Sequence, residues 1–284
     1  MSLQTLGFES DYARFFAEDD LQGNAFYLNQ LPTDEVECIL KIKSDVRLSG
    51  LPYFVGAFNY LGAKLDYKEF EKHEGKNYKK GEVITFKLPF AIALSGERIA
   101  LNLLQQATRI STFTEKFVAI AANKNTKILD TRKTTPGLRQ LEKYAVRVGG
   151  AHNHRFSQAD AWMIKDNHKT FFGGLEGAWK YFQSMQTFYQ NIIVEIHSLD
   201  ELKLAFDLGV KNVMLDNFSI EDLHKAIAMK KTGVTYEVSG GVKLENLNDF
   251  LLDGIDVISI GALTHSSPHI DLSMKIRPVG YNEF

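Results

Sequence analysis

Several features are scarce in this chain of 284 residues, and each scarcity excludes a class of protein. Cys38 is the single cysteine, so an intramolecular disulfide and a cysteine-rich metal site are both excluded. Lysine and arginine total 33 against 35 aspartates and glutamates. This net charge of −2 argues against a nucleic-acid-binding domain, which usually carries a basic excess. No apolar run approaches the roughly 20 residues that a membrane-spanning helix needs.

The first residues also lack the features of a secretory signal. Residues 1–20 contain neither a basic start nor a long apolar stretch. What is present is ordinary for a globular protein, since 44% of the residues are hydrophobic and 24% are charged. The length suits one large domain or two smaller ones. We therefore expect a cytoplasmic protein in which the positive charge needed for any anionic ligand is gathered locally.

The sequence pattern changes near Thr112. Before this residue, helical and strand-like runs are mixed. Residues 51–61 and 97–117 are expected to form helices, and apolar residues recur at helical spacing in the second range. Residues 83–88 have the composition of a strand.

After Thr112, short apolar runs alternate with helical stretches. The expected strands are residues 127–130, 161–165, 192–195, 213–216, 236–239 and 257–261. The expected helices are residues 138–146, 175–189, 199–208, 220–229 and 244–252. Alternation of this kind implies a parallel sheet. Six or seven strand–helix units in about 150 residues favour a closed α/β barrel over an open sheet.

Glycine-rich loops follow the last two expected strands. They contain Ser239-Gly240-Gly241 and Gly261. Loops after the last strands of such barrels often bind phosphate through backbone N–H groups, and glycine lets the backbone approach the anion closely. Either loop alone fits a tight turn equally well, but two of them in consecutive units favour a phosphate site.

Basic side chains are concentrated in one part of the chain. Within residues 132–168 lie Arg132, Lys133, Arg139, Arg147, His152, His154, Arg155, Lys165 and His168. Arg139 and Arg147 are at helical spacing and fit a solvated helix face. Lys165 directly follows a strand that we expect to be buried, where an unpaired ammonium is costly. It therefore needs a bound anion or a carboxylate partner.

Glu195 and Asp216 end the next two expected strands. Such a pair suits a shared Mg²⁺, which takes one or two protein carboxylates together with substrate phosphates, or a contact with sugar hydroxyls. The two carboxylates equally fit ion-pair partners of Lys165 or Arg132. His154 lies only two residues after a second histidine, whereas zinc-binding histidines on a helix are four apart, so zinc is disfavoured.

Longer stretches of the sequence resemble a known family. They are residues 130–139, 142–155, 163–168, 214–218, 238–242, 256–265 and 271–276, with 96–105 in the N-terminal half. These stretches are similar to nicotinate-nucleotide pyrophosphorylase (carboxylating), the quinolinate phosphoribosyltransferase family. The matches cover the expected barrel and reach the C-terminal tail.

The resemblance implies a two-domain α/β fold. An N-terminal α/β sandwich domain, residues 1–111, is joined by the C-terminal tail, residues 268–284. A seven-stranded TIM-like α/β barrel, residues 112–267, is the catalytic domain. The implied reaction transfers the phosphoribosyl group of phosphoribosyl pyrophosphate to quinolinate with decarboxylation. It gives nicotinate mononucleotide, pyrophosphate and CO₂, with Mg²⁺ as cofactor and a homodimer with shared active sites.

The resemblance also implies roles for individual residues. The quinolinate carboxylates are expected to meet Arg132, His154, Arg155 and Lys165. Arg98 is expected to come from the partner chain. The ribose-pyrophosphate side, with Mg²⁺ at the two carboxylates, is expected to involve Lys133, Glu195 and Asp216. The 5′-phosphate is expected to meet Ser239, Gly240, Gly241 and Gly261. Among these, the expected catalytic residues are Lys133, Lys165, Glu195 and Asp216.

The sequence departs from the family pattern in three places. Leu21 and Asn24 stand where the family has glycine and aspartate. Arg109 stands where glycine is usual. Glu195 is followed by Ile196 and His197 rather than by acidic or polar residues.

Three alternative functions fit parts of the sequence. In a barrel aldolase or lyase, Lys165 would form a Schiff base. A sister phosphoribosyltransferase, such as the molybdenum-transport-associated one, shares the fold but lacks the sequence contexts of Asp130 and Asn153. The third alternative is a non-catalytic protein that keeps the binding pocket. The presence of every charged motif residue favours the enzyme.

Overall fold

A computed structural model of the chain describes residues 5, 7–22 and 26–280. Asn24, one of the positions that depart from the family pattern, lies outside these residues. The chain divides into two compact units, and each is described separately. The first unit contains Met1–Glu115, Thr135–Gly150 and Ser267–Phe284, and the second contains Lys116–Thr134 and Ala151–Ser266.

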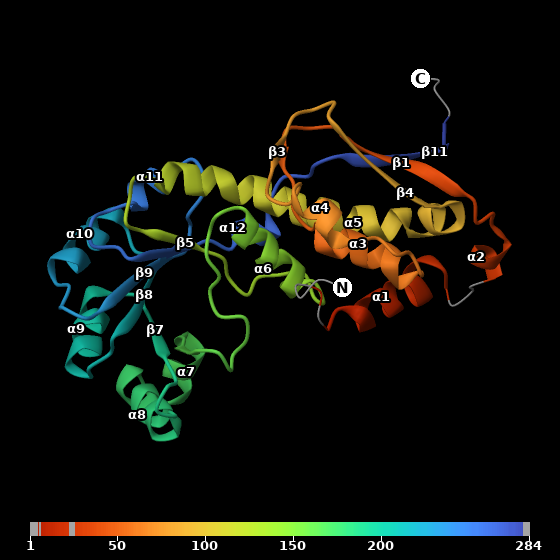
Figure 1. Cartoon of the computed structure of the whole chain (residues 1–284). Coiled ribbons are helices and arrows are strands. Elements are labelled where there is room, and N and C mark those ends of the chain that lie inside the picture. The colour runs from red at the N-terminus through yellow and green to blue at the C-terminus, as the bar shows by residue number, and fades with distance from the viewer. Residues whose placement is uncertain (1–4, 6, 23–25, 281–284) are drawn as a thin grey trace. The chain divides into compact units, whose positions relative to one another are not determined.

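Strands from both ends of the chain form one antiparallel sheet in the first unit (Figure 1). Among the described residues its order is β11 (Leu272–Pro278), β1 (Glu35–Ile42) and β4 (Val83–Pro89). Alternate residues of β1, including Cys38, are buried, as expected when one face of a sheet packs on a core. In register, Cys38 lies opposite Phe86 and Ile276.

Helices make up most of the rest of the first unit. They are α1 (Glu9–Arg14), the π-helix η2 (Phe15–Asp20), α2 (Phe26–Gln30), α3 (Leu51–Tyr60), α4 (Tyr67–Glu71), α5 (Phe90–Ala121) as far as Glu115, and α6 (Arg139–Val148). β2 (Val46–Arg47) and β3 (Asn77–Tyr78) add a small antiparallel sheet of two strands. The predicted helices at 51–61 and 97–117 are confirmed as α3 and part of α5.

Arg109 on α5 has a structural role. Its Nη1 donates hydrogen bonds to the carbonyl oxygen and the Oγ of Ser267, at 2.7 and 2.8 Å. Burial lowers the pKa of this guanidinium. Because Ser267 begins the last segment of the first unit, the arginine that replaces the usual glycine anchors that segment to α5.

Over the described part of the second unit, six parallel strands form one sheet in the order β5-β10-β9-β8-β7-β6. The strands are β5 (Lys127–Leu129), β6 (Trp162–Ile164), β7 (Ile192–Ile196), β8 (Asn212–Asp216), β9 (Thr235–Ser239) and β10 (Val257–Ser259). His152 adds a single parallel bridge to Leu129, beside β5. The fold is therefore mixed α/β, with a parallel sheet in this unit and an antiparallel sheet in the other.

Helices follow the parallel strands, and α9 and α10 lie outside the sheet (Figure 1). The helices are α7 (Asp166–Phe171), α8 (Leu175–Met185), α9 (Leu199–Asp207), α10 (Ile220–Ala228), α11 (Leu247–Phe250) and α12 (Ala262–His265). Ser198 and Ser219 cap α9 and α10 through hydrogen bonds from backbone N–H groups three residues later.

Two predicted helices are shorter than expected. α8 ends at Met185 rather than at residue 189, because Gln186 takes an extended conformation. α11 spans four residues rather than 244–252. The Asn246 side chain accepts a hydrogen bond from the Lys243 N–H at 2.7 Å and donates one to the Gly241 carbonyl at 3.1 Å. Such local side-chain bonds compete with the start of a helix.

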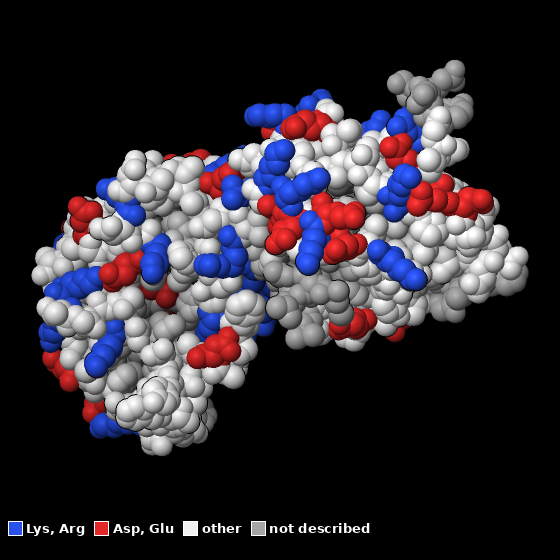
Figure 2. All heavy atoms as spheres, in the orientation of Figure 1, with Lys and Arg blue, Asp and Glu red and all other residues white. Residues whose placement is uncertain are grey.

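Charged side chains of both signs are mixed on the face of the molecule in Figure 2, as the near-neutral net charge predicts. Within the described residues, no helix is both long and apolar enough to cross a membrane.

Candidate active site at the carboxyl ends of the parallel strands

The carboxyl ends of parallel strands lie at one edge of their sheet, and most of the predicted site residues follow these ends. They are Arg132 and Lys133 after β5, Lys165 after β6, Glu195 on β7, Asp216 on β8, Ser239 to Gly241 at the end of β9 and Gly261 after β10. His154 and Arg155 follow the bridge at His152. All of these belong to the second unit, whereas Arg98 is exposed on α5 in the first.

Lys165 pairs with Glu195. Its Nζ lies 2.5 Å from Glu195 Oε2, and the two side chains are 48% and 9% exposed. The lysine thus has the carboxylate partner that its position after a buried strand required. Because about half of its surface is open, the ammonium also remains accessible to a ligand.

For Asp216, on the next strand, the surroundings disfavour the ionised side chain relative to the protonated one. Burial and then the negative charge of Glu195 raise its pKa, while His197 and Lys165 act in the opposite direction. Its Oδ2 accepts a hydrogen bond from the Asn217 amide at 2.7 Å. Two carboxylates that repel each other across neighbouring strands favour a bound cation or hydroxyl donors between them.

The two loops after the last strands need glycine for their backbone conformation or their close packing. Gly240 and Gly241 have φ angles of 90° and 66°. A Cβ on Gly240 would lie 2.2 Å from Asn217 Oδ1, so only glycine fits there without movement. A Cβ on Gly261 would lie 3.0 Å from the Lys133 side chain and 3.1 Å from His265 Nε2. Basic groups therefore adjoin the second loop, as a phosphate site requires.

The positive charges of Arg132 and Arg155 repel each other. Burial, and next the charge of Arg132, lowers the pKa of Arg155. Arg155 Nη1 donates to the Ala161 carbonyl at 2.6 Å. The Nε of Arg132 is buried and has no hydrogen-bond partner among the residues that the structure describes. An anion would satisfy this nitrogen and relieve the repulsion between the guanidinium groups.

His154 is held as a hydrogen-bond donor. The Arg155 backbone N–H donates to its Nδ1 at 2.7 Å, so in the neutral ring Nε2 carries the proton. That Nε2 forms a hydrogen bond with Glu237 Oε2 at 3.3 Å, and both side chains are less than a tenth exposed. Asp130, which is fully buried, accepts hydrogen bonds from the His154 N–H at 2.8 Å and from the Asn153 amide at 2.6 Å. These bonds fix the backbone that carries the histidine.

A cavity of ≈ 260 Å³ lies beside this pair. Its lining includes His154, Arg155 and Glu237, and it reaches Asn212 and Thr235, the first residues of β8 and β9. Glu237 was not predicted as a site residue, although a glutamate between apolar neighbours on an expected strand indicates a possible role.

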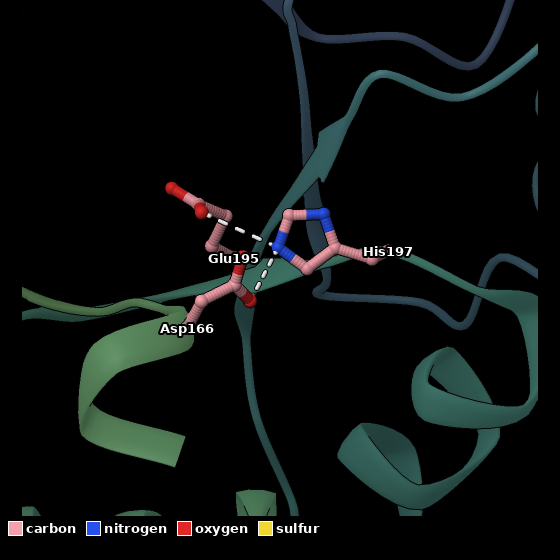
Figure 3. A group of neighbouring side chains, drawn as sticks. All are labelled: Asp166, Glu195 and His197. Atoms are coloured by element: carbon pink, nitrogen blue, oxygen red, sulfur yellow. Dashed lines mark ion pairs between the residues drawn. The ribbon is translucent and has the colours of Figure 1, made fainter. Parts of the chain in front are cut away.

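A cluster of possible metal ligands was also not predicted from the sequence. One donor atom from each of Asp166, Glu195 and His197 lies within 4.8 Å of the others (Figure 3). Burial raises the pKa of Asp166, but the hydrogen bond from Lys169 and the charge of His197 outweigh burial and hold the pKa below its ordinary value. Of the two predicted Mg²⁺ ligands, only Glu195 belongs to this cluster. The signal in the sequence was His197, two residues after Glu195.

Known proteins are similar to this chain over nearly its whole length. A protein of Bacillus subtilis (strain 168), named probable nicotinate-nucleotide pyrophosphorylase (carboxylating), is 37% identical over 263 residues, 92% of this chain and 91% of its own. The Homo sapiens nicotinate-nucleotide pyrophosphorylase (carboxylating) is 36% identical over 84% of this chain and 82% of its own. The crystal structure of NadC from Streptococcus pyogenes, 32% identical, matches with a TM-score of 0.85 and covers 97% of this chain and 98% of its own.

The family described as quinolinate phosphoribosyl transferase, C-terminal domain, matches residues 110–275. This range contains every predicted site residue except Arg98, and it includes both strand-end loops and the cationic cluster. Together with the relatives that match over both units, it identifies the family: the chain belongs to the quinolinate phosphoribosyl transferases.

Proposed function

We propose that this chain transfers the phosphoribosyl group of phosphoribosyl pyrophosphate to quinolinate and releases CO₂, forming nicotinate mononucleotide and pyrophosphate. The reaction is a step of NAD biosynthesis. The observation that carries it is the cationic pair at the strand ends. Arg132 has a buried Nε without a hydrogen-bond partner among the described residues, and its charge opposes that of Arg155. A dicarboxylate supplies the missing negative charge.

In this proposal, Arg132, Arg155 and Lys165 hold the quinolinate carboxylates. His154 completes the pocket, and its Nε2–H would donate a hydrogen bond to Glu237 or to a substrate oxygen. Positioned charges in a site closed to water are worth more than in solution, because little solvent screens them.

The phosphoribosyl pyrophosphate is proposed to bind beside the glycine loops. Ser239, Gly240, Gly241 and Gly261 would receive the 5′-phosphate on open backbone N–H groups. Lys133, whose side chain adjoins Gly261, would neutralise charge on the pyrophosphate as it leaves.

We propose Mg²⁺ as the cofactor, with Glu195, Asp216 and the substrate pyrophosphate as ligands. The residues fit a cation, because the pKa of Asp216 is raised by burial and by the neighbouring charge of Glu195. When bound, Mg²⁺ would neutralise the negative charge that develops on pyrophosphate. The carboxylates of this chain would orient the ion and the ribose hydroxyls.

Decarboxylation needs no further cofactor in this scheme. Attack of the pyridine nitrogen on the ribose anomeric carbon expels pyrophosphate and makes the ring cationic. When the carboxylate next to this nitrogen leaves as CO₂, the cationic ring stabilises the electron pair left on the ring carbon, which then takes up a proton from solvent. The protein contributes positioning and electrostatics. A Schiff base on Lys165 is disfavoured, because its Nζ is held in an ion pair with Glu195 and would have to leave it to attack a carbonyl carbon.

We further propose the finer features of the family for this chain. They are a sandwich domain over residues 1–111 with the tail 268–284, a seven-stranded barrel over 112–267, a cytoplasmic location, and a homodimer in which Arg98 reaches the partner's site. The exposed position of Arg98 on α5 is compatible with that contact.

The test is an assay with phosphoribosyl pyrophosphate, Mg²⁺ and either quinolinate or nicotinate. We expect quinolinate to give one CO₂ per nicotinate mononucleotide. Nicotinate would leave cations unpaired, so its kcat/KM should be lower by at least about 10³. Comparable turnover of nicotinate, or product from quinolinate without CO₂, would refute the carboxylating assignment.

A further inference from the structure

Three side chains converge on one point beside the strand ends (Figure 3). His197 Nε2 lies 2.7 Å from Asp166 Oδ1 and 3.3 Å from Glu195 Oε1. Two neighbouring ligands of an octahedral ion, each about 2.1 Å from it, lie about 3.0 Å apart. Two of the three donor–donor distances are therefore close to that between neighbouring ligands of one ion, and the third is within 4.8 Å.

The donors are accessible without breaking the pair that anchors Lys165. Glu195 uses Oε2 for Lys165 and turns Oε1 toward His197. The Asp166 side chain is 64% exposed and the His197 side chain 32% exposed, so an ion can enter from solvent. The buried Glu195 then forms the floor of the site.

The local charge favours a divalent cation. Lys169 lies between Asp166, at 3.1 Å, and Glu201, at 2.7 Å. Among the described side chains linked by these contacts, the cations are Lys165 and Lys169, and the carboxylates are Asp166, Glu195, Glu201 and Asp216. Leaving His197 out of the count, four carboxylates and two ammonium groups leave a net negative charge that one divalent ion neutralises.

The second nitrogen of His197 faces another carboxylate. Its Nδ1 lies 3.9 Å from Asp216 Oδ2, longer than a hydrogen bond but close enough for attraction. A carboxylate near the outer nitrogen is typical of metal-ligating histidines, because it favours a proton on that nitrogen. Nε2 now donates a hydrogen bond to Asp166, and a bound ion would take the place of that proton. Imidazole also favours transition metals, whereas Mg²⁺ takes oxygen ligands.

We infer that Asp166, Glu195 and His197 form a divalent-cation site that fills without substrate and prefers Mn²⁺ to Mg²⁺. It differs from the proposed Mg²⁺ site in using an imidazole and Asp166, and in needing no pyrophosphate. The inference does not depend on the substrates, so its failure would leave the proposed transferase activity unaffected.

The experiment measures Mn²⁺ binding to the metal-free full chain by electron paramagnetic resonance of the free ion, with Mg²⁺ as competitor. We expect one Mn²⁺ per chain, bound at least about tenfold more tightly than Mg²⁺. His197→Ala and Asp166→Asn should each weaken Mn²⁺ binding by about tenfold or more. His197→Asp should keep a site but lose the preference for Mn²⁺. His224→Ala, an exposed histidine on α10, is the matched control and should bind as the parent chain does.

Circular dichroism of every variant establishes that it is folded, and Mn²⁺ should raise the melting temperature of the parent chain but not of the folded His197→Ala variant. Absence of stoichiometric Mn²⁺ binding would show that the three side chains are only an ion-paired cluster. Unchanged Mn²⁺ affinity in folded His197→Ala, or an unchanged preference for Mn²⁺ in His197→Asp, would equally overturn the assignment.

Discussion

Replacement of Gly240 by alanine should damage both the stability and the phosphate site of the second unit. The new Cβ would lie 2.2 Å from Asn217 Oδ1, 2.6 Å from its Cγ and 3.0 Å from its backbone nitrogen. That backbone is fixed, since the Asn217 N–H donates to the Ser239 carbonyl at 2.9 Å. Gly241 is the matched control, because it also has positive φ but a Cβ there would meet no atom within 4 Å.

The expected losses of unfolding free energy distinguish backbone strain from a steric clash of the new Cβ. A left-handed conformation costs an ordinary residue about 1–2 kcal/mol, which is the whole expected loss for Gly241→Ala. Overpacking adds about 1–3 kcal/mol, so Gly240→Ala should lose about 2–5 kcal/mol of unfolding free energy. It should also raise KM for phosphoribosyl pyrophosphate, because Asn217 must move away from its position beside the loop.

Urea unfolding followed by tryptophan fluorescence measures this difference. The two tryptophans of the chain, Trp162 and Trp179, both belong to the second unit, so the signal reports that unit. In an Asn217→Gly background the clash with the amide disappears, and Gly240→Ala should cost at least about 1 kcal/mol less than in the parent chain. Equal losses for Gly240→Ala and Gly241→Ala, or no rescue by Asn217→Gly, would refute the reasoning.

Three other variants test the remaining assignments. Lys165→Ala should lower kcat for quinolinate by about 10²–10³ while the chain stays folded, since one positioned polar group is worth about 2.7–4 kcal/mol. Lys180→Ala, at an exposed lysine, is the control. Equal kcat values for Lys165→Ala and the parent chain would contradict the role of Lys165. Burial raises the pKa of Asp216 above 3.8, so its ionisation costs stability as pH rises through the folded-state pKa. Asp216→Asn should therefore raise the urea midpoint at pH 7, with a gain that shrinks as pH falls toward 3.8, and a pH-independent gain would contradict this cause. Inactive Arg98→Ala and Lys165→Ala chains should regain part of their activity when mixed; no recovery in hybrids shown to form would place Arg98 outside the partner's site.

Much of the second unit could be predicted because its signals are local. Apolar runs ending in polar residues predicted strands such as β7 and β8, and Ser198 and Ser219 predicted where helices begin. Helix length was harder to predict. α11 is short because Asn246 bonds to Lys243 and Gly241, and that geometry exists only once the loop has folded.

The chemical groups at each strand end could be read from the chain alone, since a strand and the residue that ends it depend on neighbouring residues. Which strand ends lie together depends on the folded arrangement of the sheet. His154 pairs with Glu237, which lies 83 positions further along the chain, and Lys165 pairs with Glu195, which lies 30 positions further. Such pairs depend on strand order and register, and the register that places Asp216 opposite Ser239 comes from the packing of whole strands. Neighbouring residues in the chain do not determine that packing. The contact of Glu237 with His154 and the cluster of side chains at His197 could therefore be found only in the folded structure.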